Sequence, residues 1–161
     1  MILKWRTRKD ITKYMNTDIE YNLENQKKWY ESIKNDTNNK YWVINFKEKP
    51  IGLIYLSNID YRNKKTYWGY YVGEEKFKIY GALIPKYLFY YVFEKMNFNK
   101  ILAEVMEGNE KVLKLDILLG FNYIGVLKKH IFKSNKYHNI YLLELLKENW
   151  IKNDKYDVFF E

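Results

Sequence analysis

The fold of this chain is decided by residues 67–93, which read YWGYYVGEEKFKIYGALIPKYLFYYVF. The first six residues are aromatic or β-branched apart from one glycine, a composition that predicts a β-strand. A charged connection follows, and Gly81 then leads into residues 82–93, which are apolar almost all round and predict a buried helix. The first N–H groups of a helix have no partner within it, and the helix dipole is positive there. A strand, a lysine-bearing loop and a helix start therefore predict a site for phosphate or pyrophosphate.

The composition predicts one folded domain, residues 1–161, in which we leave the tail 151–161 unassigned. A chain of 161 residues is long enough for one core, and 47% hydrophobic residues are typical of a globular protein. Cysteine is absent, which excludes disulfides, thiolate zinc sites and a cysteine nucleophile. The start lacks the apolar run of a signal peptide, and the helix at 82–93 is too short to span a bilayer. We therefore expect a cytoplasmic protein with no membrane partner.

The net charge of +8 would suit a nucleic-acid partner. The lysines, however, are spread along the whole chain, and we find neither a basic helix face nor an aromatic-plus-glycine RNA motif. We therefore expect no nucleic-acid partner. Most of these lysines are expected to be solvated, and a few to serve the phosphates of a small cofactor.

The rest of the chain predicts helices and strands in the order ααββ–βαβα–ββ. The predicted helices are residues 5–15, 23–34, 82–93 and 110–119, and the predicted strands are 41–46, 51–59, 67–72, 100–106, 123–132 and 137–146. Asn22 is expected to cap the second helix, and Gly120 to end the last one in the left-handed conformation. Residues 133–136 are expected to close a hairpin. This order predicts an α/β fold, a mixed sheet with helices on both faces.

Two motifs resemble the GNAT superfamily of N-acetyltransferases. Residues 109–121, NEKVLKLDILLGF, are similar to its Asn-x-x-Ala-x-x-Leu-Tyr-x-x-x-Gly-Phe signature, and the strand–loop–glycine–helix ahead of them resembles its acetyl-CoA pyrophosphate loop. The resemblance covers roughly residues 3–150 and implies a mainly antiparallel sheet with helices on both faces. The family's first strand precedes the helix predicted at 5–15, where only four residues stand. Either that strand is absent or the start codon has been placed too late.

Several stretches resemble one branch of the superfamily, the aminosugar-nucleotide N-acetyltransferases of pseudaminic acid synthesis used in flagellin glycosylation. These stretches are residues 5–6, 50–52, 58–60, 67–73 and 93–95. Residues 125–150 are also similar to the ribosomal-protein N-terminal acetyltransferase branch. The resemblance implies an acetyl-CoA-dependent enzyme acting on the 4-amino group of a UDP-linked amino-dideoxy sugar. A protein N-terminal amine, a polyamine or an antibiotic stays open as the acceptor. A non-catalytic CoA-binding module and a homodimer also stay open.

The resemblance implies a cofactor site along the connection after residue 70 and at the helix from 110. Its candidate residues are Tyr71, Val72, Lys76, Lys78, Ile79, Tyr80, Gly81, Ala82, Asn109, Lys111 and Lys114. In the family, N–H groups near Tyr71 and Val72 hold the pantetheine arm. Asn109 also suits a helix N-cap, and both lysines of the helix also suit a solvated surface. The family's first loop glycine falls on Ile79, which does not readily adopt positive φ, so we expect a distorted loop or a weaker hold on the cofactor.

The chemistry requires a neutral amine and stabilisation of the oxyanion that forms. The resemblance implies direct transfer without an acyl-enzyme. Glu104 is the candidate general base, acting directly or through water; its alternative is an ordinary exposed or cross-strand carboxylate. Asp116 stands where the family often has a tyrosine that protonates the leaving thiolate. An aspartate of ordinary pKa is ionised at neutral pH, so a helix-surface carboxylate is the alternative. Tyr123 and Tyr80 are further candidates for this acid.

The resemblance places the acceptor at the loop after the first helix, with Arg6, Tyr14 and Met15 as candidate residues. Aromatic rings and an arginine suit a sugar and a nucleotide diphosphate, whereas Tyr14 and Met15 equally suit the core of an amphipathic helix. His130 and His138 lie on neighbouring predicted strands without carboxylates at ligand spacing. We therefore expect no metal site.

Overall fold

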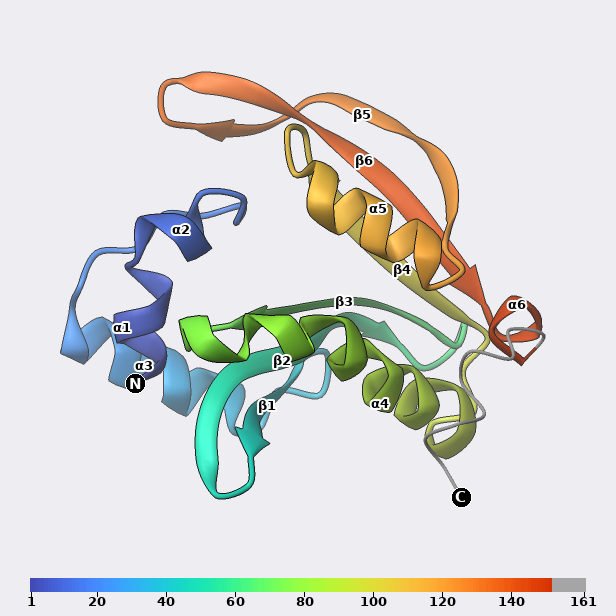
Figure 1. Ribbon diagram of the computed structural model, residues 1–161, viewed down its shortest axis with the longest axis horizontal. Helices are drawn as coiled ribbons and strands as arrows, with labels where there is room; N and C mark the ends of the chain where they lie inside the picture. Colours follow the sequence, from blue (N-terminus) through green and yellow to red (C-terminus); the bar gives the residue numbers. More distant parts are fainter. Residues whose placement is uncertain (152–161) are drawn as a thin grey trace.

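The computed structural model describes residues 1–151, and the unassigned tail beyond Ile151 lies outside the described residues. A six-stranded sheet with strand order β1-β2-β3-β4-β6-β5 forms the centre (Figure 1). Its strands are β1 Lys40–Phe46, β2 Lys49–Asp60, β3 Lys65–Val72, β4 Lys100–Met106, β5 Asn122–Lys133 and β6 Lys136–Leu146. All neighbouring strands are antiparallel except β3 and β4. The predicted mixed, mainly antiparallel sheet is confirmed.

The parallel pair β3–β4 is short, and this divides the sheet. Only three residue pairs join the two strands, Lys65 with Lys100, Thr66 with Ile101 and Tyr67 with Leu102. Beyond these pairs the two ribbons move apart (Figure 1). The later residues of both strands therefore face each other without a ladder of hydrogen bonds.

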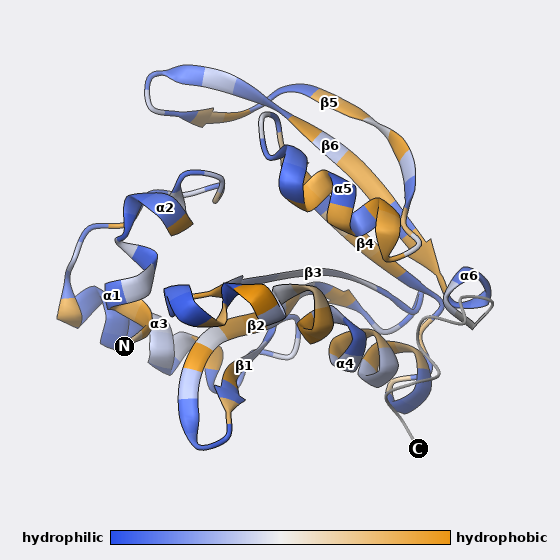
Figure 2. Ribbon diagram, in the orientation of Figure 1, coloured by the Kyte–Doolittle hydropathy of each residue, from blue (hydrophilic) through white to orange (hydrophobic). Residues whose placement is uncertain are grey.

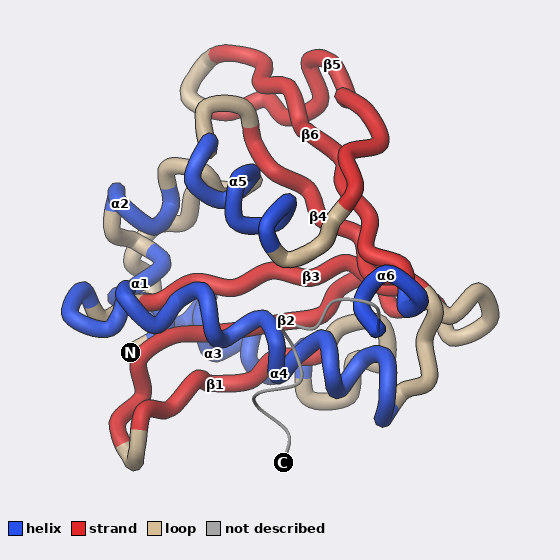
Figure 3. Tube along the Cα trace, turned by 45° about the vertical axis from the view of Figure 1, so that its right-hand side comes forward, coloured by secondary structure: helices blue, strands red, loops and turns tan. Residues whose placement is uncertain are grey.

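Helices cover both faces of the sheet. They are α1 Ile2–Arg6, α2 Lys9–Thr12, α3 Leu23–Ile33, α4 Ile84–Tyr90, α5 Glu110–Leu118 and α6 Lys147–Ile151, with a 3-10 helix η1 Glu75–Leu83 and a π-helix η2 Tyr91–Lys95. Figure 3 shows α4 crossing in front of β1–β3 and α5 in front of β4. These helices enclose the larger core, which includes Phe89, Phe93 and Trp68. On the opposite face, Trp5 and Ile11 form a smaller core with strand residues.

The helix predicted at 5–15 is wrong, because the chain breaks between α1 and α2. Arg8 is extended there, with φ −76° and ψ 134°. In this conformation its guanidinium donates to the backbone carbonyl of Gly73 and pairs with Asp10 at 2.6 Å. These contacts with β3 and with its own helix favour the break over a continuous helix. Among residues 1–151 no strand precedes α1.

The helix predicted to start at Ala82 begins later, at Ile84. An α-helix from Ala82 would need the N–H of Pro85 to bond the Gly81 carbonyl, and proline has no N–H. The structure instead places Pro85 in the first turn of α4, where that group is not needed, and the Ile84 N–H bonds Gly81. Gly81 is consequently inside a 3-10 helix and does not open an α-helix.

Three local predictions are confirmed. The Asn22 side chain caps α3 by accepting from the Asn25 N–H at 3.0 Å. Gly120 ends α5 with φ 91°. Ser134 and Asn135 both take positive φ, 51° and 60°, in the tight turn of the β5–β6 hairpin.

Candidate active site

A cavity of about 770 Å³ lies on the face of the sheet that carries α1, α2 and α3. Alternate residues of β2 and β3 point into it, since side chains along a strand alternate between the two faces. The strand residues that line it include Leu53, Tyr55, Ser57, Tyr67, Tyr71 and Glu104. Its other wall consists of α1, the segment from Tyr14 to Glu20, and Trp29 on α3.

Glu104 points into this cavity because its strand neighbours point the other way. Ala103 and Val105 are buried in the core beneath α4 and α5, so the carboxylate between them emerges on the cavity face, exposed. Burial raises the pKa of the Tyr55 and Tyr67 phenols, and the nearby Glu104 charge raises both further. Glu104 is thus a solvent-exposed carboxylate beside two phenols whose pKa values are raised.

The structure brings all three predicted acceptor residues, Arg6, Tyr14 and Met15, into the same cavity as Glu104. Arg6 uses Nη2 to donate to the carbonyl and the hydroxyl of Thr17, both at 3.3 Å. Its Nη1 is buried without a hydrogen-bond partner among residues 1–151, and so is the Tyr71 hydroxyl. Two residues that line the cavity therefore each carry a buried donor with unused hydrogen-bonding capacity.

Asp116 is not a helix-surface carboxylate, so that alternative is wrong. It is 1% exposed on the inner side of α5, and within the described chain its Oδ1 has no hydrogen-bond partner. Burial raises its pKa to about 7. Tyr70 lies close by, and its pKa rises to about 12, mainly through burial and secondarily through the Asp116 charge. This pair does not line the cavity.

The two tyrosines predicted as alternative acids lie elsewhere. Tyr123 is half exposed on the edge strand β5, where its ring lies 6.2 Å from that of Tyr141. The strand β6 separates it from β4 and Glu104. Tyr80 stacks on Phe46 at 5.2 Å, in an apolar groove between β1 and α4. The structure brings neither phenol to Glu104.

The gap between β3 and β4 presents unpaired backbone groups. The Gly73 N–H donates to the Ile51 carbonyl at 2.7 Å, so in the antiparallel ladder Tyr71 also faces β2. Tyr70 and Val72 consequently direct their N–H and C=O groups toward the gap. Of the two residues predicted to hold the pantetheine arm, Val72 faces the gap and Tyr71 does not. An extended ligand with amide groups would be able to pair with this free strand edge.

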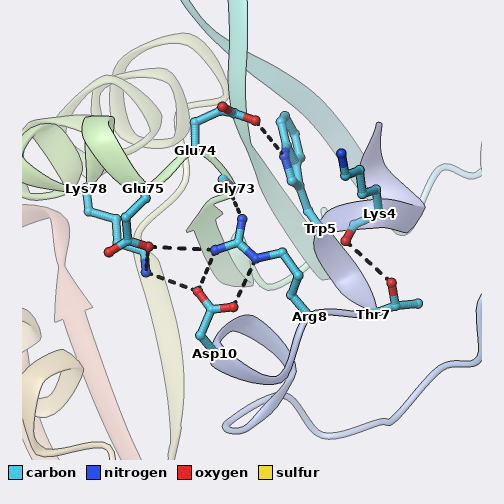
Figure 4. A network of polar contacts seen from close by, with 9 residues as sticks. All are labelled: Lys4, Trp5, Thr7, Arg8, Asp10, Gly73, Glu74, Glu75 and Lys78. Carbon is cyan, nitrogen blue, oxygen red and sulfur yellow. Dashed lines mark hydrogen bonds and ion pairs between the residues drawn. The ribbon is translucent and has the colours of Figure 1, made fainter.

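The predicted phosphate residues 76–82 lie in η1, beside an ion-pair network (Figure 4). Lys78 pairs with Glu75 at 2.6 Å and with Asp10 at 3.1 Å. The Asp10 pKa falls to about 2, chiefly through its hydrogen bond with Arg8 and then through Lys78. This network joins η1 to α2, two elements that lie far apart in the sequence.

The backbone at Ile79 shows no strain, and the expected weaker hold on the cofactor stays a prediction. No residue of η1 has positive φ, and the Ile79 side chain is 81% exposed. Gly81 lies within η1, and its contact with the cofactor stays a prediction. A Cβ there would lie 3.5 Å from the Tyr70 hydroxyl, an ordinary contact. Lys76 and Ala82 are exposed nearby.

The predicted cofactor residues of α5 lie at its start. Asn109 occupies the N-cap position, but its side chain makes no capping hydrogen bond. Lys111 and Lys114 are exposed on the helix. Their contacts with CoA remain a prediction.

Sequence reasoning missed several cavity residues, among them Tyr55, Ser57, Asp18 and Glu20. A signal for the strand residues was present, since Leu53, Tyr55 and Ser57 alternate along β2 on one face. No pattern placed Asp18 or Glu20, because their position depends on how the irregular segment after α2 folds back over the sheet.

Across residues 1–151 no three His, Asp or Glu side chains gather closely enough to hold a metal ion. In the same part of the chain, no helix is both long enough and apolar enough to cross a membrane.

Comparison with known proteins gives three findings. A family described as the acetyltransferase (GNAT) domain matches residues 1–142. The acetyltransferase PseH of Campylobacter jejuni subsp. jejuni serotype O:23/36 (strain 81-176) is 30% identical over 115 residues, 71% of each chain. YdaF of Bacillus subtilis (strain 168), named as a candidate ribosomal N-acetyltransferase, is 29% identical over 101 residues, 62% of this chain and 55% of YdaF.

A solved structure shows the same fold at lower sequence identity. It is the spermidine N-acetyltransferase from Vibrio cholerae in complex with CoA and spermine, with a TM-score of 0.86 and 20% identity. The similarity covers 94% of this chain and 90% of that one. At this identity the comparison concerns the fold alone.

Proposed function

The chain belongs to the acetyltransferase (GNAT) family and is an acetyl-CoA-dependent N-acetyltransferase. From this premise we propose that its acceptor is an amine that also carries an anionic group, namely the 4-amino group of a UDP-linked amino-dideoxy sugar. The cavity beside Glu104 is the proposed acceptor site, and the gap between β3 and β4 is the proposed site for the cofactor arm. Support for the sugar comes from the similarity to PseH and from the donors in the cavity.

The backbone of the gap fits the cofactor. Bound acetyl-CoA supplies the acetyl thioester that the amine attacks. The free N–H and C=O groups of Tyr70 and Val72 would hold its amide-bearing arm, as a strand edge holds an extended peptide. Residues 76–82, Asn109, Lys111 and Lys114 stay as proposed contacts for the phosphates and the rest of the cofactor.

Glu104 is the proposed general base. An amine is protonated at neutral pH and must lose a proton before it can act as a nucleophile. The carboxylate lies in the cavity and reaches solvent, so it would accept that proton directly or through one water and release it to bulk. Asp116, on the other face of the sheet, is the proposed acid for the departing thiolate, because burial raises its pKa to about 7 and leaves it partly protonated at neutral pH.

The single observation that carries the anionic acceptor is the unpaired Arg6 Nη1. A buried guanidinium N–H without an acceptor is unfavourable by on the order of 1–3 kcal/mol. This group lines the cavity together with the unpaired Tyr71 hydroxyl. A phosphate oxygen would satisfy both donors, and guanidinium binds phosphate with matched geometry.

A polyamine is the second candidate acceptor. The observation that favours it is the pair of carboxylates Glu20 and Glu104, which line the same cavity and would attract a polycation. The Vibrio cholerae enzyme of the same fold binds spermine, although at 20% identity this carries no weight for the acceptor.

A thiol-release assay with acetyl-CoA and three acceptors tests the proposal. The acceptors are a UDP-linked 4-amino sugar, the same amino sugar without its nucleotide, and spermine. We expect kcat/KM for the nucleotide form to exceed both others by at least about tenfold, the worth of one charge-assisted hydrogen bond. A higher kcat/KM for spermine would contradict the sugar as acceptor and support a polyamine in its place.

The variant Arg6→Lys sharpens the same assay, with Arg62→Lys on an exposed turn as its matched control. Lysine keeps the charge and loses the planar fork. We expect KM for the nucleotide sugar to rise by about tenfold in Arg6→Lys and not in the control, with KM for acetyl-CoA unchanged in both. An unchanged acceptor KM in Arg6→Lys would remove this residue from acceptor binding.

A further inference from the structure

Lys133 is a buried lysine at the otherwise solvent-exposed end of the β5–β6 hairpin. Its side chain is 7% exposed, whereas the neighbouring Phe132 and Tyr137 are 62% and 60% exposed. The end of the β5–β6 hairpin is coloured hydrophilic in Figure 2 and reaches over α2. A charged group is buried only where partners compensate its lost hydration, so the surroundings of this ammonium carry information.

The ammonium has three close acceptors on one segment of the chain, and the Lys13 carbonyl lies further off at 3.5 Å. It donates to the backbone carbonyl of Thr12, to that of Met15 at 2.7 Å, and pairs with the Asp18 carboxylate at 3.0 Å. A lysine ammonium has three donors, so this arrangement satisfies all of them. The first carbonyl belongs to the last residue of α2, and it also accepts from the Met15 N–H at 2.9 Å. The hydrogen bond from Lys133 also lowers the pKa of Asp18.

The segment held in this way is a wall of the cavity. Residues 14–20 all line it, and they contain no helix or strand of their own to fix their path. Arg6 holds the same segment through its two hydrogen bonds to Thr17. The path of this wall is therefore held by Arg6 from α1, by Lys133 from the distant hairpin, and by the Thr12 hydroxyl, which donates to the Asp18 carboxylate at 3.1 Å.

We propose that Lys133 is a positioning residue that tethers the segment 14–20 to the β5–β6 hairpin and thereby sets the affinity of the cavity for its acceptor. The proposal rests on the proposed function of the cavity as the acceptor site. Lys133 itself does not line the cavity, and no role in binding acetyl-CoA follows from its contacts. Its effect is expected on the acceptor alone.

Hydrogen exchange of the intact protein tests the tether without any substrate. The variant Lys133→Met keeps an unbranched side chain and removes the charge and all three donors. Lys136→Met is the matched control, because Lys136 faces Lys133 across the hairpin register and is exposed. We expect amides of residues 13–18 to exchange at least about tenfold faster in Lys133→Met and unchanged in Lys136→Met, given the worth of a charge-assisted hydrogen bond.

Kinetics with the UDP-linked 4-amino sugar and with spermine test the consequence. For whichever acceptor the wild type acetylates, we expect the acceptor KM to rise about tenfold in Lys133→Met, with KM for acetyl-CoA within twofold of wild type. Asp18→Asn is the milder second variant, since Asp18 is largely exposed and its loss leaves both carbonyl contacts in place. Asp18→Asn should raise both the exchange rate at residues 13–18 and the acceptor KM, each by less than Lys133→Met does.

The outcomes separate the two proposals. If the wild type acetylates neither acceptor, the proposed function fails, and faster exchange in Lys133→Met still supports the tether. If the wild type is active while the acceptor KM of Lys133→Met is unchanged, the positioning role is overturned and the function stands. Unchanged exchange at 13–18 in both Lys133→Met and Asp18→Asn would overturn the tether itself. An equal rise in both KM values would overturn the positioning role, because the effect would not be specific to the acceptor.

Discussion

The two faces of the sheet place a carboxyl group in opposite surroundings. On the face covered by α4 and α5, Asp116 is 1% exposed within a core of aromatic and aliphatic side chains, and its pKa is raised to about 7. On the face covered by α1–α3, Glu104 is exposed in a cavity of about 770 Å³ among polar groups. The two residues are twelve positions apart in the sequence, yet only one reaches solvent.

This difference shows that the sheet separates a buried carboxyl group on one face from a solvent-exposed carboxylate on the other. On the dry face burial raises the pKa of Asp116 to about 7 and that of Tyr70 to about 12, because ionisation there is poorly solvated. On the cavity face the Glu104 carboxylate is open to solvent, which the proposed base needs if water is to carry its proton away. The cofactor arm is proposed to lie where the pairing of β3 and β4 ends, between the two faces.

The largest expected effect is that of Glu104→Gln on the cavity face. The amide cannot accept the proton of the amine, so kcat/KM for the acceptor should fall by about a hundredfold or more. The loss should be greatest at low pH, where most of the amine is protonated. Calorimetric affinity for acetyl-CoA should be unchanged. Glu48→Gln, in the exposed β1–β2 turn, is the control. A wild-type pH profile in Glu104→Gln would exclude the base role.

The second effect concerns Asp116→Asn on the dry face. Because the folded-state pKa of about 7 lies above the ordinary value of 3.8, the wild type binds this proton more tightly when folded. Its contribution to stability is therefore complete below about pH 4 and is lost as pH rises through 7, by on the order of 4 kcal/mol. Urea unfolding at pH 5 and pH 8 should show the variant gaining stability relative to wild type at the higher pH. An identical difference at both pH values would mean that Asp116 is ionised in the fold.

A smaller effect is expected where α1 packs on β3. A Cβ at Gly73 would lie 2.2 Å from the Trp5 ring, which is 4% exposed and hydrogen-bonded to Glu74. Gly73→Ala should therefore displace the ring and lower the free energy of unfolding by about 1–3 kcal/mol. Gly81→Ala is the matched control, since its Cβ would make only an ordinary contact. Equal melting temperatures for the two variants would contradict this packing.

The smallest effect is expected for Ile79→Gly. The side chain is 81% exposed and the backbone has no positive φ, so glycine relieves no strain there. We expect a loss of stability of about 1 kcal/mol or less from glycine in a helix, and an affinity for acetyl-CoA within about threefold of wild type. A tenfold tighter affinity would show that this isoleucine does restrict the phosphate loop.

The strands, the hairpin and both caps followed from local patterns, because alternation, turn residues and capping side chains act within a few positions. The helix start at Ile84 could also have been predicted from the sequence, because Pro85 prevents an α-helix from starting at Ala82. The break at Arg8 could not have been predicted, because it depends on the carbonyl of Gly73, 65 positions away. The burial of Asp116 was missed for the same reason, as the helix face that turns inward is decided by packing.

Within the site, sequence reasoning found Glu104 and Arg6 through family resemblance, and the structure brings both into one cavity. It did not find the acidic residues Asp18 and Glu20 or the tether at Lys133. These depend on how an irregular segment meets a hairpin more than a hundred positions later. Such contacts leave no periodic pattern.

The most direct test of the account is a crystal structure of the protein with CoA and the UDP-linked 4-amino sugar. The account predicts the sugar nucleotide in the cavity under α1–α3, with a phosphate oxygen on Arg6 Nη1 and the amine turned toward Glu104. CoA should lie between β3 and β4 and pair with the backbone of Val72. A sugar nucleotide bound instead in the apolar groove between β1 and α4, away from Glu104, would contradict it.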